Sequence, residues 1–212
     1  MTEEAPSRRW RDVAAAAAED GDHYAEEYAE RFRQLAAEGA DVHGEAALVA
    51  ALVPPPATVL DAGCGTGRVG VRLAELGYDL VGCDVDSAMV DVARAEAPDL
   101  DWRVADLATL GLGARFDVVL LAGNVVPLLE EGTLATTLAR VVDHLAEGGV
   151  ALLGFGTDED HLPDGCPVTD LDDVVAAAAT AGLVESDRWG TWARDPWDAA
   201  GGYVVLALSL TR

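Results

Sequence analysis

Glycines and an acidic residue alternate in one short stretch of the chain and could bind a ligand there. An apolar run ends at Asp61, and Gly63, Gly65 and Gly67 follow at alternate positions before a helix-forming segment starts at Arg68. Glycines leave the loop without side-chain walls, so backbone N–H groups can approach a ligand closely, and the start of a helix favours negative charge nearby. The sequence therefore predicts a ligand-binding loop directly after a strand.

Two classes of ligand fit this glycine loop. Residues 65–70 read GTGRVG, which matches the G-x-G-x-x-G pattern of dinucleotide-binding folds, and Asp84 stands near the ~20 residues downstream where that pattern has a ribose-binding acid. That pattern begins with a glycine directly after the strand, whereas here Asp61 and Gly63 come first. An NAD(P)-dependent oxidoreductase is therefore one of the two interpretations of this loop.

Three polar residues follow other apolar runs in the same way. Asp84 closes the next run along the chain, and a carboxylate in this place can accept hydrogen bonds from both hydroxyls of a ribose. Asp106 and Asn124 follow the two runs after that. Open α/β sheets bind ligands beyond the carboxyl ends of their strands, so we expect these side chains to face one crevice.

Apolar runs and helical stretches alternate through the middle of the chain. Several runs are continuous Val and Leu segments, typical of strands buried on both faces, and the helical stretches end at Gly or Pro. This alternation predicts an α/β fold with a doubly wound, Rossmann-like, mostly parallel sheet. The expected strands are 58–62, 79–84, 101–105, 116–122 and 149–155, and the expected helices are 68–76, 87–97 and 130–145.

The end of the chain breaks this alternation. A helix at 170–181 leads into apolar runs at 183–192 and 203–210, with a turn-rich segment and no helix between them. Two strands joined in this way must be antiparallel neighbours. The sequence therefore predicts a reversed C-terminal β-hairpin.

The beginning of the chain is helical. Apolar side chains recur at helical spacing from Tyr24 to Leu35, and a second short helix at 45–53 precedes three consecutive prolines. Residues 1–8 carry few large apolar groups and are expected to be a loose tail. We expect an N-terminal helical segment at 1–53 and a core at 54–212, which together form one folding unit.

At these motifs the sequence resembles the class I S-adenosylmethionine-dependent methyltransferases, whose first motif is an acid followed by G-x-G-x-G. The resemblance covers about residues 57–156, and the reversed hairpin at the C-terminus also fits the family. It implies S-adenosylmethionine as cofactor, S-adenosylhomocysteine as product, and methyl transfer by in-line displacement to a small-molecule acceptor. It also implies that the N-terminal helical segment, residues 1–53, acts as a lid over the cofactor.

The resemblance further implies a role for each motif. Asp61 would lie near the methionine amino group, the glycines would pass under the cofactor, and Asp84 would bind the ribose. Met89 would pack on the adenine, although simple core packing explains this residue equally well, and Asp106 would accept a hydrogen bond from the adenine amino group. The expected cofactor-binding residues are Asp61, Gly63, Cys64, Gly65, Gly67, Asp84, Val85, Met89, Ala105, Asp106, Leu107 and Asn124.

The sequence identifies the acceptor side less sharply. His23 and His161 are the candidate bases, and each can equally be a surface histidine, whereas His144 stands late in a helix and is expected to be structural. The three tryptophans of the final hairpin could line an acceptor pocket or simply pack. No acidic or histidine cluster has metal-ligand spacing, so no metal is expected. A protein that binds the cofactor without catalysis is a third interpretation.

Charge excludes nucleic acids as expected partners. The chain has 212 residues with 38 acidic and 14 basic side chains, all of the latter Arg, for a net charge of −24. Binding to DNA or RNA relies on Lys and Arg that neutralise phosphates. The Val-Val-Pro that follows Asn124 also departs from the Asn-Pro-Pro-aromatic motif of amino-methylating nucleic-acid enzymes.

Composition also bears on location and redox state. No apolar run approaches the ~18 residues of a membrane span, and the N-terminus opens with acidic residues rather than a signal peptide. We therefore expect a cytoplasmic protein with no membrane partner. Cys64, Cys83 and Cys166 are expected to be reduced, mostly buried thiols. The sequence does not indicate an oligomeric state.

Overall fold

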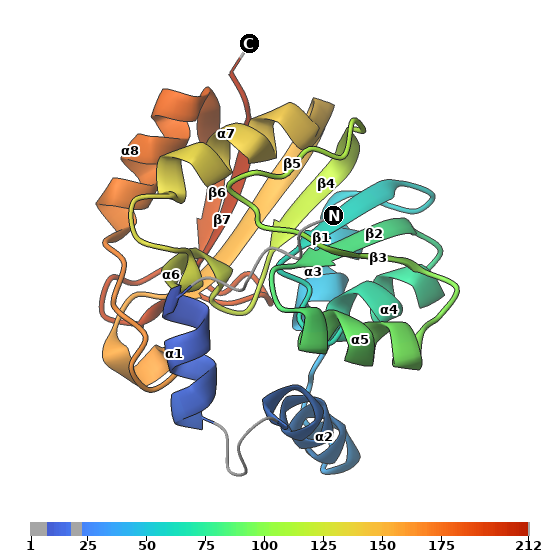
Figure 1. Cartoon of the computed structure of the whole chain (residues 1–212). Coiled ribbons are helices and arrows are strands. Elements are labelled where there is room, and N and C mark those ends of the chain that lie inside the picture. The colour runs from blue at the N-terminus through green and yellow to red at the C-terminus, as the bar shows by residue number, and fades with distance from the viewer. Residues whose placement is uncertain (1–7, 18–22, 212) are drawn as a thin grey trace.

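A seven-stranded sheet organises the part of the chain that the computed structural model describes, residues 8–17 and 23–211. The strand order is β3-β2-β1-β4-β5-β7-β6 (Figure 1). Strands β1 to β5 pair in parallel, whereas β7 is antiparallel to both β5 and β6. The strands are β1 Thr58–Ala62, β2 Asp79–Asp84, β3 Asp101–Val104, β4 Phe116–Leu121, β5 Leu145–Gly156, β6 Leu183–Trp189 and β7 Tyr203–Leu210.

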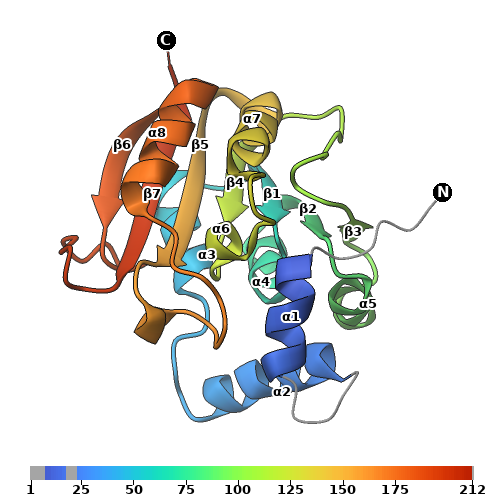
Figure 2. The same cartoon turned by 60° about the vertical axis from the view of Figure 1, so that its left-hand side comes forward.

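Helices cover both faces of this sheet. Figure 2 shows α7 and α8 on one face and α3 and α4 on the other. The helices are α1 Arg8–Ala17, α2 Tyr24–Ala37, α3 Gly44–Leu52, α4 Arg68–Glu75, α5 Ser87–Glu96, α6 Val125–Leu128, α7 Leu134–His144, the 3-10 turn η1 Glu159–His161, and α8 Leu171–Ala181.

Consecutive residues of the central strands enter two separate cores. On β4, Leu121 packs in the core that includes Leu138 of α7, whereas Leu120 packs in the core that includes Leu73 of α4. Because side chains alternate across a strand, continuous apolar runs supply both faces of the sheet. The predicted doubly wound α/β fold is therefore confirmed.

The reversed C-terminal hairpin is also confirmed. Strand β7 lies between β5 and β6 and pairs with both, with an irregularity in β6 between Glu185 and Asp187. The predicted strand at 183–192 ends earlier, at Trp189, because a turn follows in which the Gly190 N–H donates to the Asp195 carbonyl.

The segment between β4 and β5 differs most from the prediction. The helix expected at 130–145 begins only at Leu134, since Gly132 adopts a left-handed φ of 80° that interrupts it. The helix ends at His144, whose buried ring accepts a hydrogen bond from the Leu112 N–H at 3.0 Å. His144 thus has the structural role expected of it.

Helices α1 and α2 lie at the carboxyl ends of the parallel strands, at the bottom of Figure 1. The loose tail expected at 1–8 falls outside the described residues except for Arg8, which begins α1. Helix α2 begins at Tyr24 and ends at Ala37, close to the predicted stripe. Among the described residues, no helix is long and apolar enough to cross a membrane.

Candidate functional site

A cavity lies where the carboxyl ends of β1, β2 and β4 meet helices α1 and α2. Open α/β sheets bind ligands at this position. Most of the predicted cofactor-binding residues line it together, although they come from four separate segments. They are Asp61, Gly63, Cys64, Gly65, Asp84, Val85, Met89, Asp106 and Leu107.

The glycine loop is tied to β2 by its backbone. The N–H groups of Gly63 and Cys64 both donate to the Cys83 carbonyl, at 2.8 and 3.0 Å. Gly63, Gly65 and Gly67 all have left-handed φ, at 85°, 52° and 81°, which side chains on these residues would strain. The loop conformation thus requires glycine at each of these positions.

The three glycines differ in the space that a side chain on each of them would find. A Cβ on Gly63 would collide with the Val125 side chain, and one on Gly67 would meet the Trp102 ring at 2.8 Å. Gly67 is not among the residues that line the cavity, so its place under the ligand stays a prediction. Nothing lies within 4 Å of a Cβ on Gly65, so this residue leaves open space where a ligand can approach the backbone.

Asp61 is a buried carboxyl with an unused oxygen. The residue is 2% exposed, and its Oδ2 atom has no hydrogen-bond partner among the described residues. Burial raises the pKa of Asp61 to about 7, while the Arg68 guanidinium lowers it and Glu45 raises it. A buried acceptor without a partner is costly, so this wall of the cavity suits a ligand that brings a positive donor.

Asp84 joins the glycine loop to the start of α5. Its Oδ2 accepts from the Gly65 N–H and its Oδ1 from the Asp86 N–H, both at 2.9 Å. Burial raises its pKa to about 6. Each carboxylate oxygen has a second lone pair, so Asp84 can still accept hydrogen bonds from ligand hydroxyls.

Residues that follow β3 also line the cavity. Asp106 lies in the cavity wall, and its Oδ1 accepts from the Ala108 N–H at 2.7 Å, which stabilises the turn after β3. Met89 is 2% exposed and also lines the cavity, so core packing and ligand contact are compatible. Ala105 is not in the cavity wall, because its N–H faces β2 and donates to the Asp84 carbonyl.

Asn124 corrects the sequence prediction, because its side chain does not line the cavity. Its Oδ1 accepts from the Gly156 N–H at 2.7 Å, and its Nδ2 donates to the His161 carbonyl at 3.1 Å. The residue has a left-handed φ of 67°, which turns the side chain toward the end of β5. Asn124 therefore joins the end of β5 to the end of η1 at the edge of the site.

The two candidate bases also lie outside the cavity wall. His23 is exposed and precedes α2. His161 is exposed, and its Nδ1 lies 2.7 Å from Asp158 Oδ1. The structure thus places neither imidazole in the cavity wall, because His23 precedes α2 and His161 ends η1, where both residues are exposed. His161 contacts Asn124 through its backbone carbonyl.

Sequence reasoning did not assign an aromatic cover to the cavity. Trp10, Tyr24 and Tyr28 line it, and the Trp10 and Tyr24 rings meet edge to face with centroids 5.6 Å apart. The Trp10 Nε1–H donates to Asp86 Oδ2 at 2.6 Å. The helical spacing of Tyr24 and Tyr28 was a usable signal, whereas nothing in the sequence around Trp10 indicates a contact with Asp86.

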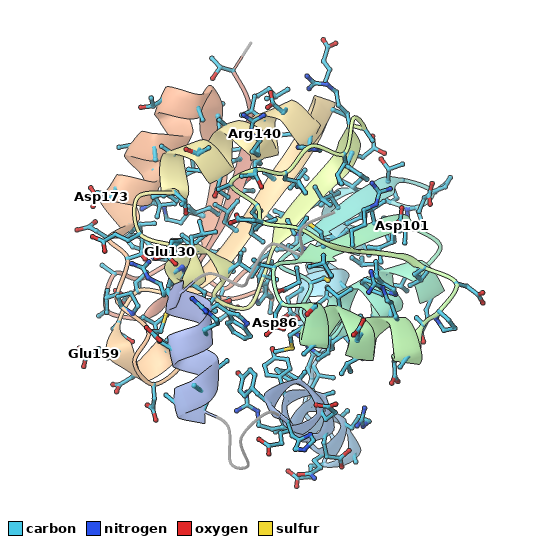
Figure 3. The ribbon with its side chains drawn as sticks, in the orientation of Figure 1. Asp86, Asp101, Glu130, Arg140, Glu159 and Asp173 are labelled. Carbon is cyan, nitrogen blue, oxygen red and sulfur yellow. The ribbon has the colours of Figure 1, made fainter. Side chains whose placement is uncertain are left out.

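The first turn of α1 also binds the other side of the cavity. The Arg9 side chain donates to the carbonyls of Leu129, at 2.7 Å, and Pro127, at 3.2 Å. In Figure 3, Asp86 and Glu130 lie on either side of this turn. Two adjacent residues of α1 therefore contact opposite sides of the cavity. Arg9 contacts the segment after β4, and Trp10 contacts Asp86.

An ion pair connects the glycine loop to the cover. Arg68, which lines the cavity, forms two hydrogen bonds with Glu45 of α3, at 2.6 and 3.1 Å, and donates to the Val42 carbonyl. Its guanidinium lies 4.5 Å from the centroid of the Phe32 ring on α2. The only basic side chain among the lining residues of the described chain is thus already paired.

The tryptophans of the C-terminal hairpin pack rather than line the cavity. Trp189 and Trp192 pack against the core on the face of the sheet that α3 and α4 cover. Trp197 packs against the core on the opposite face. Of the two interpretations of these residues, the packing one is confirmed.

Comparisons with known proteins agree with this site. A family described as a methyltransferase domain matches residues 59–149. A dTDP-3-amino-3,6-dideoxy-alpha-D-glucopyranose N,N-dimethyltransferase from Streptomyces fradiae is 32% identical over 120 residues, 54% of this chain and 47% of that protein. A magnesium-protoporphyrin O-methyltransferase from Rhodobacter capsulatus is 33% identical over 110 residues, 48% of each chain. The matched segment spans about half the length of these curated relatives.

A solved structure extends the similarity beyond the glycine loop. The chain is 33% identical to a TehB-like SAM-dependent methyltransferase from Corynebacterium glutamicum, with a TM-score of 0.80, and the match covers 89% of this chain and 98% of that one. The amino pentose methyltransferase CalS10 from Micromonospora echinaspora, at 22% identity and a TM-score of 0.67, shares the fold over 85% of this chain and 95% of that one. With this similarity, the 3-2-1-4-5-7-6 sheet and the acidic glycine loop, the chain belongs to the class I S-adenosylmethionine-dependent methyltransferase family.

Proposed function

We propose that the protein transfers a methyl group from S-adenosylmethionine to a small-molecule acceptor. The observation that carries this proposal is Asp61, a buried carboxyl residue that lines the cavity and whose Oδ2 has no hydrogen-bond partner among the described residues. The amino group of the methionine moiety is a donor of the right charge for it. A dinucleotide would instead bring its pyrophosphate to this buried carboxylate, so the same atom disfavours the oxidoreductase alternative.

The rest of the cavity fits the other parts of the cofactor. The open space at Gly65 allows the ligand to contact the backbone, and Asp84 can accept the ribose hydroxyls. Asp106 can accept from the adenine amino group, with Met89 and Leu107 as apolar surfaces beside the ring. When bound there, S-adenosylmethionine supplies a methyl group activated by its sulfonium.

The chain itself has to align the acceptor and exclude water, since methyl transfer is an in-line displacement. We propose that residues 1–53 act as the lid over the core at 54–212. The contacts of Trp10 with Asp86 and of Arg9 with Leu129 support this, because they join helix α1 to the core on both sides of the cavity.

The net charge of the chain and the names of its relatives support a small molecule as the acceptor. The net charge of −24 disfavours nucleic acids. The two curated relatives are named for an amino sugar nucleotide and for magnesium protoporphyrin, both small molecules.

Calorimetric titration of the full-length protein with S-adenosylmethionine, S-adenosylhomocysteine and NADH tests the proposal. We expect micromolar binding of the first two and none of NADH, followed by methyl transfer to at least one acceptor in a broad screen. Binding of NADH alone would make the glycine loop a dinucleotide site. Binding of S-adenosylmethionine without transfer to any acceptor would identify a non-catalytic cofactor-binding protein.

A further inference from the structure

The cavity has a second wall, which the proposed cofactor residues do not provide. It consists of Trp10, Tyr24, Leu128, Leu129, Glu130 and Pro163, and we call it the acceptor wall. These residues come from α1, α2 and the segments after β4 and β5. An acceptor aligned with the methyl group of a cofactor on the glycine loop would have to contact this wall.

The charges around the cavity select against an anionic acceptor. Glu130 is the charged member of the acceptor wall, and Asp61, Asp84 and Asp106 lie in the rest of the lining. The guanidinium of Arg68 is held by Glu45 in a bidentate ion pair. A carboxylate or phosphate acceptor would therefore meet carboxylates without an uncommitted cation among the described lining residues.

Arg9 is a second cation near this wall among the described residues, and its guanidinium is engaged outside the cavity. Its guanidinium donates to the carbonyls of Pro127 and Leu129, and it does not line the cavity. Its backbone N–H donates to Glu130 Oε2 at 3.3 Å. A carboxylate has about four lone-pair sites and can accept a ligand donor beside the partners that it already has.

The remaining members of the acceptor wall suit a positively charged group on an apolar body. The Trp10 and Tyr24 rings meet edge to face at 5.6 Å, and aromatic faces attract ammonium groups. Leu128, Leu129 and Pro163 add apolar surface beside Glu130. A carboxylate next to aromatic rings is a combination that recognises an amine better than an alcohol of the same shape.

Resting on the proposed methyl-transfer function, we infer that the acceptor is a small amine with an apolar body, and that Glu130 is its specificity-determining residue. The bound ammonium gives one proton to the Glu130 carboxylate, which passes it to solvent. The freed nitrogen lone pair forms the new N–CH3 bond while the S–CH3 bond breaks and its electron pair stays on sulfur. The products are the N-methylated ammonium, S-adenosylhomocysteine and one proton.

Acceptor analogues that differ in a single group test this inference. One set is 2-phenylethylamine, 2-phenylethanol and phenylacetate, and a second is glucosamine, glucose and glucuronate. The full-length protein saturated with S-adenosylhomocysteine is titrated with each compound by calorimetry, and methyl transfer from S-adenosylmethionine is followed by mass spectrometry. We expect an amine to bind best within at least one set and to be methylated on nitrogen.

Variants at two neighbouring residues separate a direct role of Glu130 from the effect of removing one negative charge near the cavity. Glu130→Gln should weaken amine binding about tenfold, the loss expected for one hydrogen bond to a charged group, and leave alcohol and S-adenosylhomocysteine binding unchanged. Glu131→Gln removes the same charge from the next residue, which is exposed and outside the cavity wall, and should change none of these affinities.

The inference is overturned if no amine binds, if an alcohol or carboxylate binds as well as its matched amine, or if both variants weaken the amine equally. A parent protein that binds neither S-adenosylmethionine nor S-adenosylhomocysteine would instead refute the proposed function. The two failures are therefore distinguishable in one experiment.

Discussion

The floor of the cavity and its cover are held in different ways. The floor, made by the glycine loop and the ends of β1 and β2, is fixed by backbone hydrogen bonds such as those from Gly63 and Cys64 to Cys83. The cover, helices α1 and α2, is joined to the core through side chains, among them Trp10 and Arg9. The floor thus depends on chain conformation, and the cover on a few individual groups.

This difference predicts how the two regions respond to substitution. A change in the floor acts on a conformation that only certain residues can adopt, so its effect on ligand binding is large. A change in the cover removes one hydrogen bond and leaves the sheet intact, so its effect is about 1 kcal/mol.

The largest expected effect is that of Gly65→Val in the floor. A branched side chain would fill the open space beside the ligand, so cofactor affinity should fall by more than roughly 100-fold, or about 2.7 kcal/mol. Gly113→Val is the matched control, because Gly113 also has a left-handed φ, of 67°, and open space around it, yet lies outside the cavity wall. Both variants should lose about 1–2 kcal/mol of stability from backbone strain, measured by urea unfolding. Calorimetry showing equal cofactor affinity in the two variants would remove Gly65 from the site.

Asp61→Asn comes next. Replacing the carboxylate removes a charge-assisted hydrogen bond worth about 1.5–3 kcal/mol, so affinity for S-adenosylmethionine should fall roughly 10- to 100-fold. Because the carboxyl is buried without a partner for Oδ2 among the described residues, the free energy of unfolding at pH 8 should not fall. Calorimetry and urea unfolding measure both quantities, and an unchanged affinity would contradict the assignment of Asp61 to the ligand ammonium.

The raised pKa of Asp61 gives a further expectation, of about fivefold in affinity between pH 6 and 7, because the ionised fraction of a carboxyl with a pKa of about 7 rises from about a tenth to a half over this range. Since burial raises this pKa from its ordinary 3.8 to about 7, the carboxylate that the ligand needs becomes fully available only above neutrality. In the unliganded protein, ionisation of Asp61 at higher pH has the opposite effect, because it lowers the free energy of unfolding. The folded state binds the proton more tightly, so the free energy of unfolding falls as pH rises from about 4 to 7. Asp84, with a pKa of about 6, adds to the lower part of that window.

The Asp61→Asn variant is the control for both pH profiles. Its affinity should change less than that of the parent between pH 6 and 7, and its unfolding free energy should depend less steeply on pH than that of the parent. Titrations in matched ionic strength over pH 5 to 8 measure this. Parallel curves for parent and variant would assign the pH dependence to other groups.

The smallest effect is expected in the cover. Trp10→Phe keeps an aromatic ring over the cavity but loses the Nε1–H bond to Asp86, so cofactor affinity should fall about fivefold, near 1 kcal/mol. Trp197→Phe, in the loop between β6 and β7 and outside the cavity wall, is the matched control. Stopped-flow measurement of S-adenosylhomocysteine dissociation should show faster release from Trp10→Phe alone. A loss as large as that of Gly65→Val would show that the cover is as rigid as the floor.

The strands were predictable because their signal is local. Thr58–Ala62 and Asp79–Asp84 are bounded as expected, since apolar runs ended by turn residues describe strands buried on both faces. The helix expected at 130–145 was not, because Gly132 could equally be tolerated inside a helix. Its left-handed φ belongs instead to a turn in which the Thr133 N–H donates to the Glu130 carbonyl.

By itself the sequence determined the doubly wound sheet, the reversed hairpin and the acidic glycine loop with Asp61, Asp84 and Asp106 at strand ends. These features follow from periodicity and spacing within short segments. Only the tertiary structure decided that Trp10 lies on Asp86, that Glu130 shares the cavity with them, and that Asn124 turns away from it. The physical reason is that these contacts join residues from separate elements, whose side chains meet according to how helices and loops pack on the sheet and not according to the order of residues along the chain.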